Sequence, residues 1–195
     1  MSDAASPRPD GHARRRAGTR SQIVDAAVRL VARQGFSATS VEDIAAEAKV
    51  AKGSVYYNFE SKQDILAAAL AEGGQRLQDS LATARADLHG RAALDALTTA
   101  LLSSMQAHPD FAKLMAAEVF RAERAWQETI GAVRGITIGM FEQVLEELRP
   151  GEDVSVLAAA MFGAVLLAGL EWLVVQPERS LADVRASIAP LTSGI

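Results

Sequence analysis

Lysine, serine and tyrosine side chains are concentrated between Thr39 and Lys62, in the first third of the chain. Side chains of these types donate hydrogen bonds to phosphate oxygens, and a glycine among them allows a backbone to approach a ligand closely. The residues of this kind are Thr39, Ser40, Lys52, Gly53, Ser54, Tyr56, Tyr57 and Lys62. The stretch therefore has the composition of a surface that contacts a polyanion.

Two short helices joined by a tight turn are predicted to hold these side chains in place. Thr39 is expected to cap the first helix through its side-chain oxygen, and Glu42, three residues later, completes a capping box. The turn contains Lys49, which is expected to take a left-handed conformation without the help of glycine. The second helix covers residues 51–57, and Ala51 has no side-chain oxygen with which to cap it.

Lys62 falls in the first turn of the next helix, which Ser61 is predicted to cap. A cation in the first turn opposes the helix dipole, so Lys62 should have a partner outside its own helix. A phosphate is the natural candidate for that partner.

The stretch from about Ala17 to Leu77 resembles the DNA-binding domain of the TetR family of transcriptional regulators. The family often has glycine at the position of Lys49 and serine at the position of Ala51. The residues that carry the resemblance are Ile23, Ala26, Ala27, Leu30, Gly35, Phe36, Thr39, Ile44 and the run K-G-S-V-Y-Y-N-F followed by Ser61 and Lys62.

The resemblance implies a helix-turn-helix head over residues 17–77, with its recognition motif at about 40–59. Lys52 and Ser54 are the candidates for base edges. The candidates for phosphate contacts are Thr39, Lys52, Tyr56, Tyr57 and Lys62, and Ser40 is counted among the DNA-binding residues. It also implies a homodimer on a near-palindromic DNA operator, acting as a repressor that a small molecule releases. A dimeric regulator without an effector is the alternative.

The distribution of charge agrees with a DNA-binding N-terminal part. The formal net charge of the 195 residues is −4, but residues 1–62 hold ten Lys/Arg against seven Asp/Glu, a net charge of +3. Residues 63–195 hold ten Lys/Arg against seventeen Asp/Glu, a net charge of −7. A basic head on an acidic body is typical of a protein that binds DNA with one domain only.

The N-terminal residues 1–16 are predicted to be a disordered basic tail. Arg14, Arg15 and Arg16 either remain solvated or contact phosphates and the minor groove. The tail lacks an apolar secretion segment and the chain has no cysteine, so a cytoplasmic location is expected.

The remainder of the chain reads as helical throughout, without strand-like alternation, and the predicted fold class is all-α. Residues 78–195 would form a larger helical bundle for ligand binding and dimerisation. The predicted helices cover residues 19–34, 61–88, 91–107, 109–122, 125–148, 153–176 and 180–191.

The helix over 153–176 is apolar nearly all round and is expected to be buried on both sides rather than to span a membrane. A single chain of this size has difficulty burying both sides of such a helix. The helix over 153–176 and the last helix are therefore predicted to pack against the same two helices of a second protomer in a dimer. Glu171 lies on its small-residue side and needs a partner, either an arginine across the dimer or a cationic ligand group.

Large soft side chains in the body are candidates for a ligand cavity, since ligand sites in helical bundles lie between helices and are mostly apolar. Ordinary core packing accounts for many such side chains. The effector is expected to be a small apolar or cationic molecule. The residues predicted to line its site are Phe111, Met115, Trp126, Val133, Met140 and Phe162.

Glycines interrupt two of the predicted helices. Gly73 and Gly74 either make a kink for packing or form a compliant joint between head and body. Gly131, Gly135 and Gly139 lie at intervals of four. They allow either the close approach of another helix or room for a ligand or for bending.

No catalytic constellation is visible. His12, His89 and His108 have no metal-ligand spacing, and neither a Gly-rich phosphate loop nor a G-x-S-x-G motif occurs. The sequence therefore predicts neither an enzyme, nor a cofactor, nor a metal site. A helical enzyme is kept only as a remote alternative.

Overall fold

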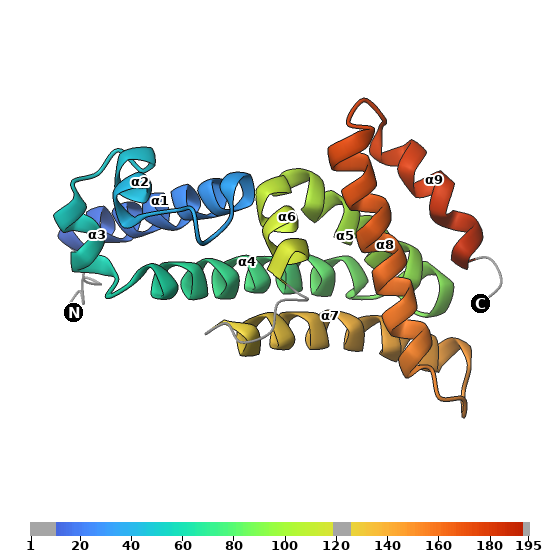
Figure 1. Cartoon of the computed structure of the whole chain (residues 1–195). Helices are drawn as coiled ribbons and strands as arrows, with labels where there is room; N and C mark the ends of the chain where they lie inside the picture. The colour runs from blue at the N-terminus through green and yellow to red at the C-terminus, as the bar shows by residue number, and fades with distance from the viewer. Residues whose placement is uncertain (1–10, 119–125, 193–195) are drawn as a thin grey trace, which may run out of the picture. The chain divides into compact units, whose positions relative to one another are not determined.

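The structure is a computed structural model that describes residues 11–118 and 126–192. Over these residues it consists of helices and contains no strand, which confirms the all-α prediction (Figure 1). The helices are α1 (Gly11–Gln34), α2 (Val41–Glu47), α3 (Lys52–Asn58), α4 (Lys62–Arg85), α5 (Gly90–Ala107), α6 (Pro109–Glu118), α7 (Gln127–Leu148), α8 (Ser155–Val175) and α9 (Leu181–Thr192).

The chain divides into two compact units, Met1–Ala69 and Leu70–Ile195. The first unit holds α1, α2, α3 and the first residues of α4, and the second holds the rest of α4 and the helices that follow. The division falls inside α4, earlier in the chain than the boundary predicted after residue 77. The continuous helix α4 is thus the covalent connection between the units.

Helix α1 begins at Gly11, so the predicted disordered tail is wrong over residues 11–16, and the predicted start at residue 19 is too late. Alanine and arginine are strong helix formers, and they dominate the segment 13–17, which allows the helix to extend toward the N-terminus. Residues 1–10 of the predicted tail lie outside the described residues.

Helix α4 runs through Gly73 and Gly74 without a break, so the predicted interruption does not occur. Both glycines are buried. A Cβ atom on Gly73 would overlap the ring of Phe111, and one on Gly74 would overlap Cγ2 of Val133. The glycines therefore serve as close-packing positions for α6 and α7, which supports the packing interpretation rather than the compliant joint.

We expect Gly73→Ala to destabilise the second unit by about 1–3 kcal/mol, because the added methyl group must displace the Phe111 ring. Gly131→Ala is the matched control on α7. A Cβ there meets nothing within 4 Å, so the higher helix propensity of alanine should stabilise the protein by about 0.5–1 kcal/mol. Thermal or urea unfolding of both variants measures the difference, and equal effects would contradict the packing role.

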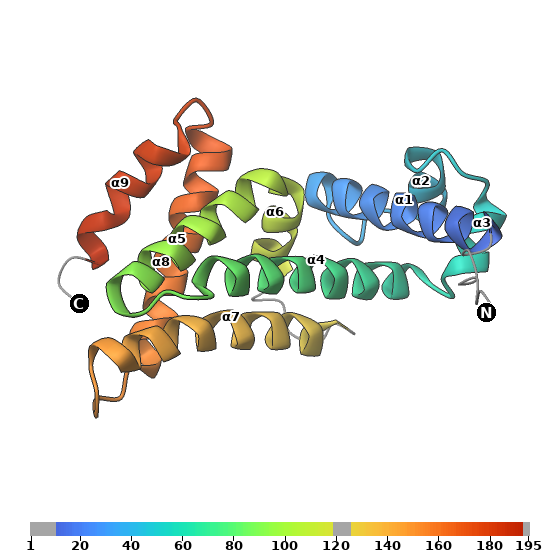
Figure 2. The ribbon, with the colours of Figure 1, turned by 180° about the vertical axis from the view of Figure 1, so that it is seen from behind.

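The core of the second unit is built on α5, whose buried face includes Leu94, Leu97, Leu101 and Met105 at a spacing of three and four residues. Helix α5 packs against α6, α7, α8 and α9, and Figure 2 shows it from behind beside α8 and α9. The large side chains buried in this core are Leu94, Leu97, Leu102, Phe141, Leu145, Met161, Val165 and Trp172. This packing fixes the positions of α7 and α8 against α5.

Helix α8 is long and apolar enough to cross a membrane by length and composition, a property that core helices of soluble proteins share. Only 28% of its most apolar window is buried within the chain, so the prediction of burial on both sides fails for a single chain. Its bulky side faces inward. Its outer stripe follows a spacing of four and three and consists of Val156, Ala160, Gly163, Leu167, Glu171 and Val174.

Glu171 is exposed in the single chain instead of buried, and its Oε1 accepts a hydrogen bond from Nε2 of Gln176 at 3.1 Å. Within a single chain Glu171 therefore does not need the charged partner that was predicted for a buried carboxylate. It is the one charged residue in an otherwise apolar outer stripe of α8.

Candidate DNA-binding surface and ligand pocket

Helix α2 is capped by Ser40, one residue later than predicted. The Ser40 hydroxyl accepts the backbone N–H of Asp43 at 3.0 Å, and the Asp43 carboxylate accepts the backbone N–H of Ser40 at 2.9 Å. Hydrogen bonds from the Ser40 hydroxyl and backbone hold the pKa of Asp43 below its usual range. The capping box therefore pairs Ser40 with Asp43, not Thr39 with Glu42.

Thr39 is buried, with 2% of its surface exposed. Its hydroxyl donates to the carbonyl oxygen of Gly35 at 2.9 Å and closes the loop between α1 and α2. This placement argues against the phosphate contact predicted for the Thr39 side chain.

The turn between α2 and α3 matches its prediction. Lys49 has a φ of +56°, the left-handed conformation that glycine usually supplies. Ala51 occupies the N-cap position of α3 and makes no side-chain hydrogen bond there. The change from glycine and serine at these two positions thus leaves the helix-turn-helix geometry intact.

Helix α3 presents its predicted DNA-contacting residues to solvent. Tyr56 is 52% exposed and Tyr57 is 71% exposed, while Val55 is buried and anchors the helix from below. Lys52 and Gly53 are also exposed. Exposed tyrosines beside a lysine and a glycine form a surface suited to phosphates and base edges.

Lys52 forms an ion pair with Glu42 of α2 across the helix-turn-helix. The hydrogen bond from Lys52 holds the pKa of Glu42 below its usual range, and the same bond raises the pKa of Lys52. Both side chains remain about half exposed. The lysine is therefore held at the outer surface of the head, where it is accessible to a phosphate.

Lys62 begins α4, and Ser61 precedes it as the predicted cap, with its hydroxyl accepting the backbone N–H of Asp64 at 3.1 Å. The Nζ atom of Lys62 donates to the carbonyl oxygens of Phe36 at 2.7 Å and Thr39 at 2.5 Å. It also lies 4.1 Å from the centroid of the Phe36 ring. The predicted partner outside its own helix thus exists within the head.

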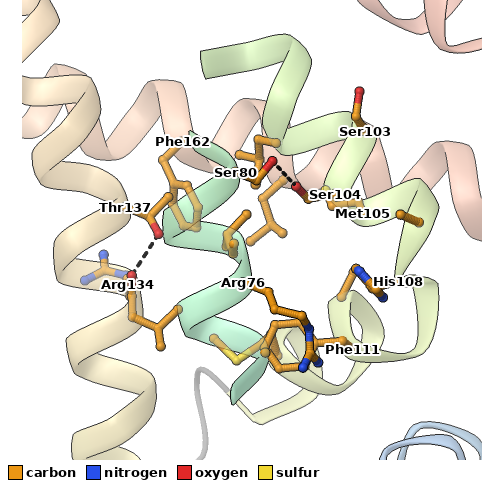
Figure 3. A pocket seen from close by; sticks show the side chains of 18 residues that line it. Arg76, Ser80, Ser103, Ser104, Met105, His108, Phe111, Arg134, Thr137 and Phe162 are labelled. Atoms are coloured by element: carbon orange, nitrogen blue, oxygen red, sulfur yellow. Dashed lines mark hydrogen bonds between the residues drawn. The ribbon is translucent and has the colours of Figure 1, made fainter. Parts of the chain in front are cut away.

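The second unit contains a cavity of about 330 Å³ between α4, α5, α6, α7 and α8 (Figure 3). Most of its wall is apolar. Ser80 of α4 and Ser104 of α5 are hydrogen-bonded to each other at 3.2 Å within it. The residues that line it are Gly73, Arg76, Leu77, Ser80, Leu101, Ser103, Ser104, Met105, Ala107, His108, Phe111, Ala112, Met115, Val133, Arg134, Thr137, Phe162 and Leu166.

Four of the six predicted ligand-site residues line this pocket, namely Phe111, Met115, Val133 and Phe162. Trp126 does not, because its ring is buried and its Nε1 donates to Oε2 of Glu118 at 3.3 Å. Met140 does not either, and lies in a separate surface groove with Leu88 and Ile136.

The wall contributed by α4 was missed in the prediction, which treated this helix as a connection. Gly73, Leu77 and Ser80 recur at intervals of four and three, the spacing that places residues on one face of a helix. That pattern, together with the nearby Arg76, was the available signal for a pocket wall.

The ionisable residues of the pocket lining are two arginines and one histidine. Arg76 and His108 lie beside Phe111 at one end of the pocket, and Arg134 belongs to the α7 wall (Figure 3). None of the eighteen lining residues is acidic. This lining gives no support to the cationic effector that was predicted, because a buried cation needs an acidic or acceptor-rich partner. Among the described residues no group of three or more metal-ligating side chains is present.

A helix-turn-helix head joined by a single helix to a helical body with an internal pocket defines the class of DNA-binding transcriptional regulators. Residues 23–69 match the family model described as bacterial regulatory proteins, tetR family. The match confirms the predicted resemblance of the head to the TetR family of transcriptional regulators over residues 23–69.

Two curated relatives and one solved structure illustrate the similarity. The uncharacterized HTH-type transcriptional regulator YvkB of Bacillus subtilis (strain 168) is 27% identical over 67% of this chain and 66% of its own length. The HTH-type transcriptional repressor KstR2 of Rhodococcus jostii (strain RHA1) is 32% identical over 52% of this chain and 50% of its own. The alignments therefore span between half and about two thirds of these relatives.

The solved structure is the transcriptional regulator FadR from Bacillus subtilis in complex with stearoyl-CoA. It aligns with a TM-score of 0.77 over 90% of this chain and 98% of its own, at 22% sequence identity. At this identity the likeness establishes the fold of the chain beyond the matched head.

Proposed function

We propose that this regulator is a homodimeric repressor that leaves a near-palindromic operator when an amphipathic anionic molecule with an acyl chain binds its body. The observation that carries the proposal is the pocket, an apolar cavity with Arg76 and His108 at one end and no acidic residue in its lining. Its volume of about 330 Å³ falls within the range of about 300–1,000 Å³ for small-molecule sites.

The DNA surface proposed for each protomer is the outer side of α3 with the start of α2. Lys52 and Ser54 near the start of α3 would reach base edges, as the first residues of recognition helices do. Ser40, Tyr56 and Tyr57 would contact phosphates, and Gly53 would let the backbone come close to the DNA. The exposure of these tyrosines supports the assignment, since it leaves their hydroxyl groups accessible to phosphate oxygens.

The proposed dimer forms through α8 and α9. The outer stripe of α8 exposes apolar side chains at a spacing of four and three, the pattern of a helix that packs against another helix. Gly163 would set the distance between the two paired α8 helices. A Cβ built at Gly163 meets nothing within 4 Å in the single chain, so the partner helix has room to approach there. Two such helices from each protomer would make a four-helix interface, and its two-fold axis matches a near-palindromic operator.

The ligand class follows from the pocket. An acyl chain fits between Phe111, Phe162 and Leu166, and an anionic group at its end would pair with Arg76. Arg76 has no ion-pair partner among the described residues and is exposed at the rim, so its guanidinium is accessible. The stearoyl-CoA bound by the FadR structure named above supports an acyl compound.

We expect laurate or lauroyl-CoA to raise the unfolding temperature and to release the protein from its operator, whereas dodecyltrimethylammonium of equal chain length should do neither. Arg76→Gln should weaken laurate binding about 10- to 100-fold, the loss expected when a hydrogen-bonded charge is removed. Calorimetric titration and fluorescence anisotropy on an operator selected from a random duplex pool provide the measurements.

Arg33→Gln is the matched control, because it removes the same charge from α1, outside the pocket lining and outside α8 and α9, and should leave laurate binding unchanged. Preferential binding of the ammonium compound would contradict the anionic class. Operator binding that responds to none of the three compounds would favour the alternative, a dimeric regulator without such an effector.

A further inference from the structure

The mostly apolar wall of the ligand pocket contains a pair of serine hydroxyl groups that face each other. The hydroxyl of Ser104 on α5 donates to the hydroxyl of Ser80 on α4 at 3.2 Å, and both residues line the cavity (Figure 3). Both side chains are partly buried. The pair therefore presents a polar group to any molecule that fills the pocket, at a place separate from the basic residues beside Phe111.

The hydrogen bond within the pair leaves one hydroxyl proton without an acceptor. A serine hydroxyl has one proton to donate and two lone pairs that accept. The bond between Ser80 and Ser104 uses one of the two protons, and no other hydrogen bond joins either hydroxyl to the described residues. Thr137, on the α7 wall, shows the usual alternative, because its hydroxyl donates to the carbonyl oxygen of Val133 at 2.8 Å, one turn earlier in its own helix. The serine pair thus keeps a donor that the threonine has already used.

We infer that the effector carries, besides its anionic group, a hydroxyl or carbonyl oxygen on its chain that binds the Ser80–Ser104 pair. The inference rests on the proposed function, whose acyl compound it narrows to a hydroxylated or oxo-substituted one. Ser80 follows Arg76 by four residues, a rise of about 6 Å along α4, so the oxygen and the anionic group are separate groups of the ligand. A carbonyl oxygen accepts the remaining serine proton, and a hydroxyl accepts it and donates to a serine lone pair.

The pair is expected to give a preference rather than an absolute requirement. When a ligand has no oxygen at this place, the two serines remain bonded to each other, and only one proton lacks an acceptor. One hydrogen bond between neutral groups changes a dissociation constant by about 3- to 10-fold. Unsubstituted laurate should therefore still bind, less tightly than a laurate with a well-placed oxygen.

The test measures ligand affinities of the full-length protein by calorimetric titration. The ligands are laurate, laurates with one hydroxyl at carbon 3, 6 or 12, and uncharged 1-decanol. The double variant Ser80→Ala with Ser104→Ala removes both hydroxyls and leaves no unpaired partner behind. Ser103→Ala is the matched control, because Ser103 lines the pocket from the same helix as Ser104 but does not belong to the pair. Alanine has a higher helix propensity than serine, so both variants should stay folded, and their unfolding temperatures check this.

We expect at least one hydroxylaurate to bind the unmutated protein about 3- to 10-fold more tightly than laurate does. The double variant should lose this preference and keep its affinity for laurate within about twofold, since replacing both partners of a hydrogen bond by apolar groups is nearly neutral. Ser103→Ala should keep the preference. The comparison of ligands on the unmutated protein is independent of any effect of the substitutions on folding.

The inference is overturned if no hydroxylaurate binds more tightly than laurate, or if the preference survives in the double variant. It is also overturned if the double variant weakens laurate as strongly as the hydroxylaurates, because the pair would then bind the carboxylate. If neither laurate nor its hydroxylated forms bind, the anionic class of the proposed function fails, and 1-decanol decides the role of the serine pair. A loss of 1-decanol affinity in the double variant supports that role, and equal affinity or no binding overturns it.

Discussion

Leu167→Glu is expected to convert the dimer to a monomer and to lower operator affinity by about 100-fold or more. Leu167 lies in the outer stripe of α8 and is 69% exposed in the single chain, so the folded protomer should tolerate the change. In the dimer the new carboxylate would be buried one helical turn from Glu171, without a cation in α8 to pair with it. Light scattering measures the assembly, and fluorescence anisotropy measures the affinity.

The loss in affinity is large because the two heads of a dimer bind as linked modules. Once one head is bound, the second binds at a high effective concentration, which adds a factor of about 10²–10⁴ to the affinity. A monomer keeps only the contacts of one half-site. The variant should therefore bind a single half-site as the unmutated head does, although it fails on the full operator.

Leu88→Glu is the matched control for this prediction. Leu88 is another exposed leucine, 38% accessible, and belongs to the connection between α4 and α5 rather than to α8 or α9. This variant should remain dimeric and keep its operator affinity. A dimeric Leu167→Glu protein would place the interface elsewhere, and monomers of both variants would show that any added charge disrupts assembly.

Gly53→Leu is expected to reduce operator affinity by about 10- to 100-fold while the head stays folded. A Cβ at Gly53 meets nothing within 4 Å, so the side chain has room in the free protein. Leucine also has a higher helix propensity than glycine, by up to about 1 kcal/mol in a helix interior. Stability should therefore be unchanged or higher, and the loss arises only when DNA approaches the start of α3.

The contrast between stability and binding separates this prediction from a folding defect. Gly135→Leu on α7 is the matched control, because a Cβ there also meets nothing within 4 Å. It should leave operator affinity unchanged. If Gly53→Leu binds the operator as well as the unmutated protein, the start of α3 does not approach the DNA closely. Lys52 and Ser54 would then be too far from the bases to contact their edges as proposed.

The helices of the head and their caps could be predicted where residues a few positions apart decide the outcome. Ser61 caps α4 through its neighbour Asp64, and Lys49 takes its left-handed conformation within the turn itself. The start of α2 shows the limit of such reasoning. Two overlapping capping boxes are possible there, Thr39 with Glu42 and Ser40 with Asp43. Burial of the Thr39 hydroxyl against the Gly35 carbonyl selects the second.

The pocket illustrates what residue type can and cannot predict. Size and apolar character identified Phe111, Met115, Val133 and Phe162 as candidates, because ligand sites in helical bundles are mostly apolar. Residue type does not identify the helix that each side chain will meet. Trp126 is also large and apolar, and yet it packs beside Glu118 outside the pocket.

By itself the sequence determined the all-helical class, the helix-turn-helix and the resemblance of the head to the TetR family, since these depend on spacing and residue type along a continuous stretch. Only the tertiary structure decided the role of Gly73, which leaves room for Phe111, and the partners of Lys62 in the α1–α2 loop. It also decided that the lining charges of the pocket are basic. The physical reason is the same each time. The deciding contact joins residues that lie more than twenty positions apart in the sequence, and the pattern of neighbouring residues does not predict which distant groups will come into contact.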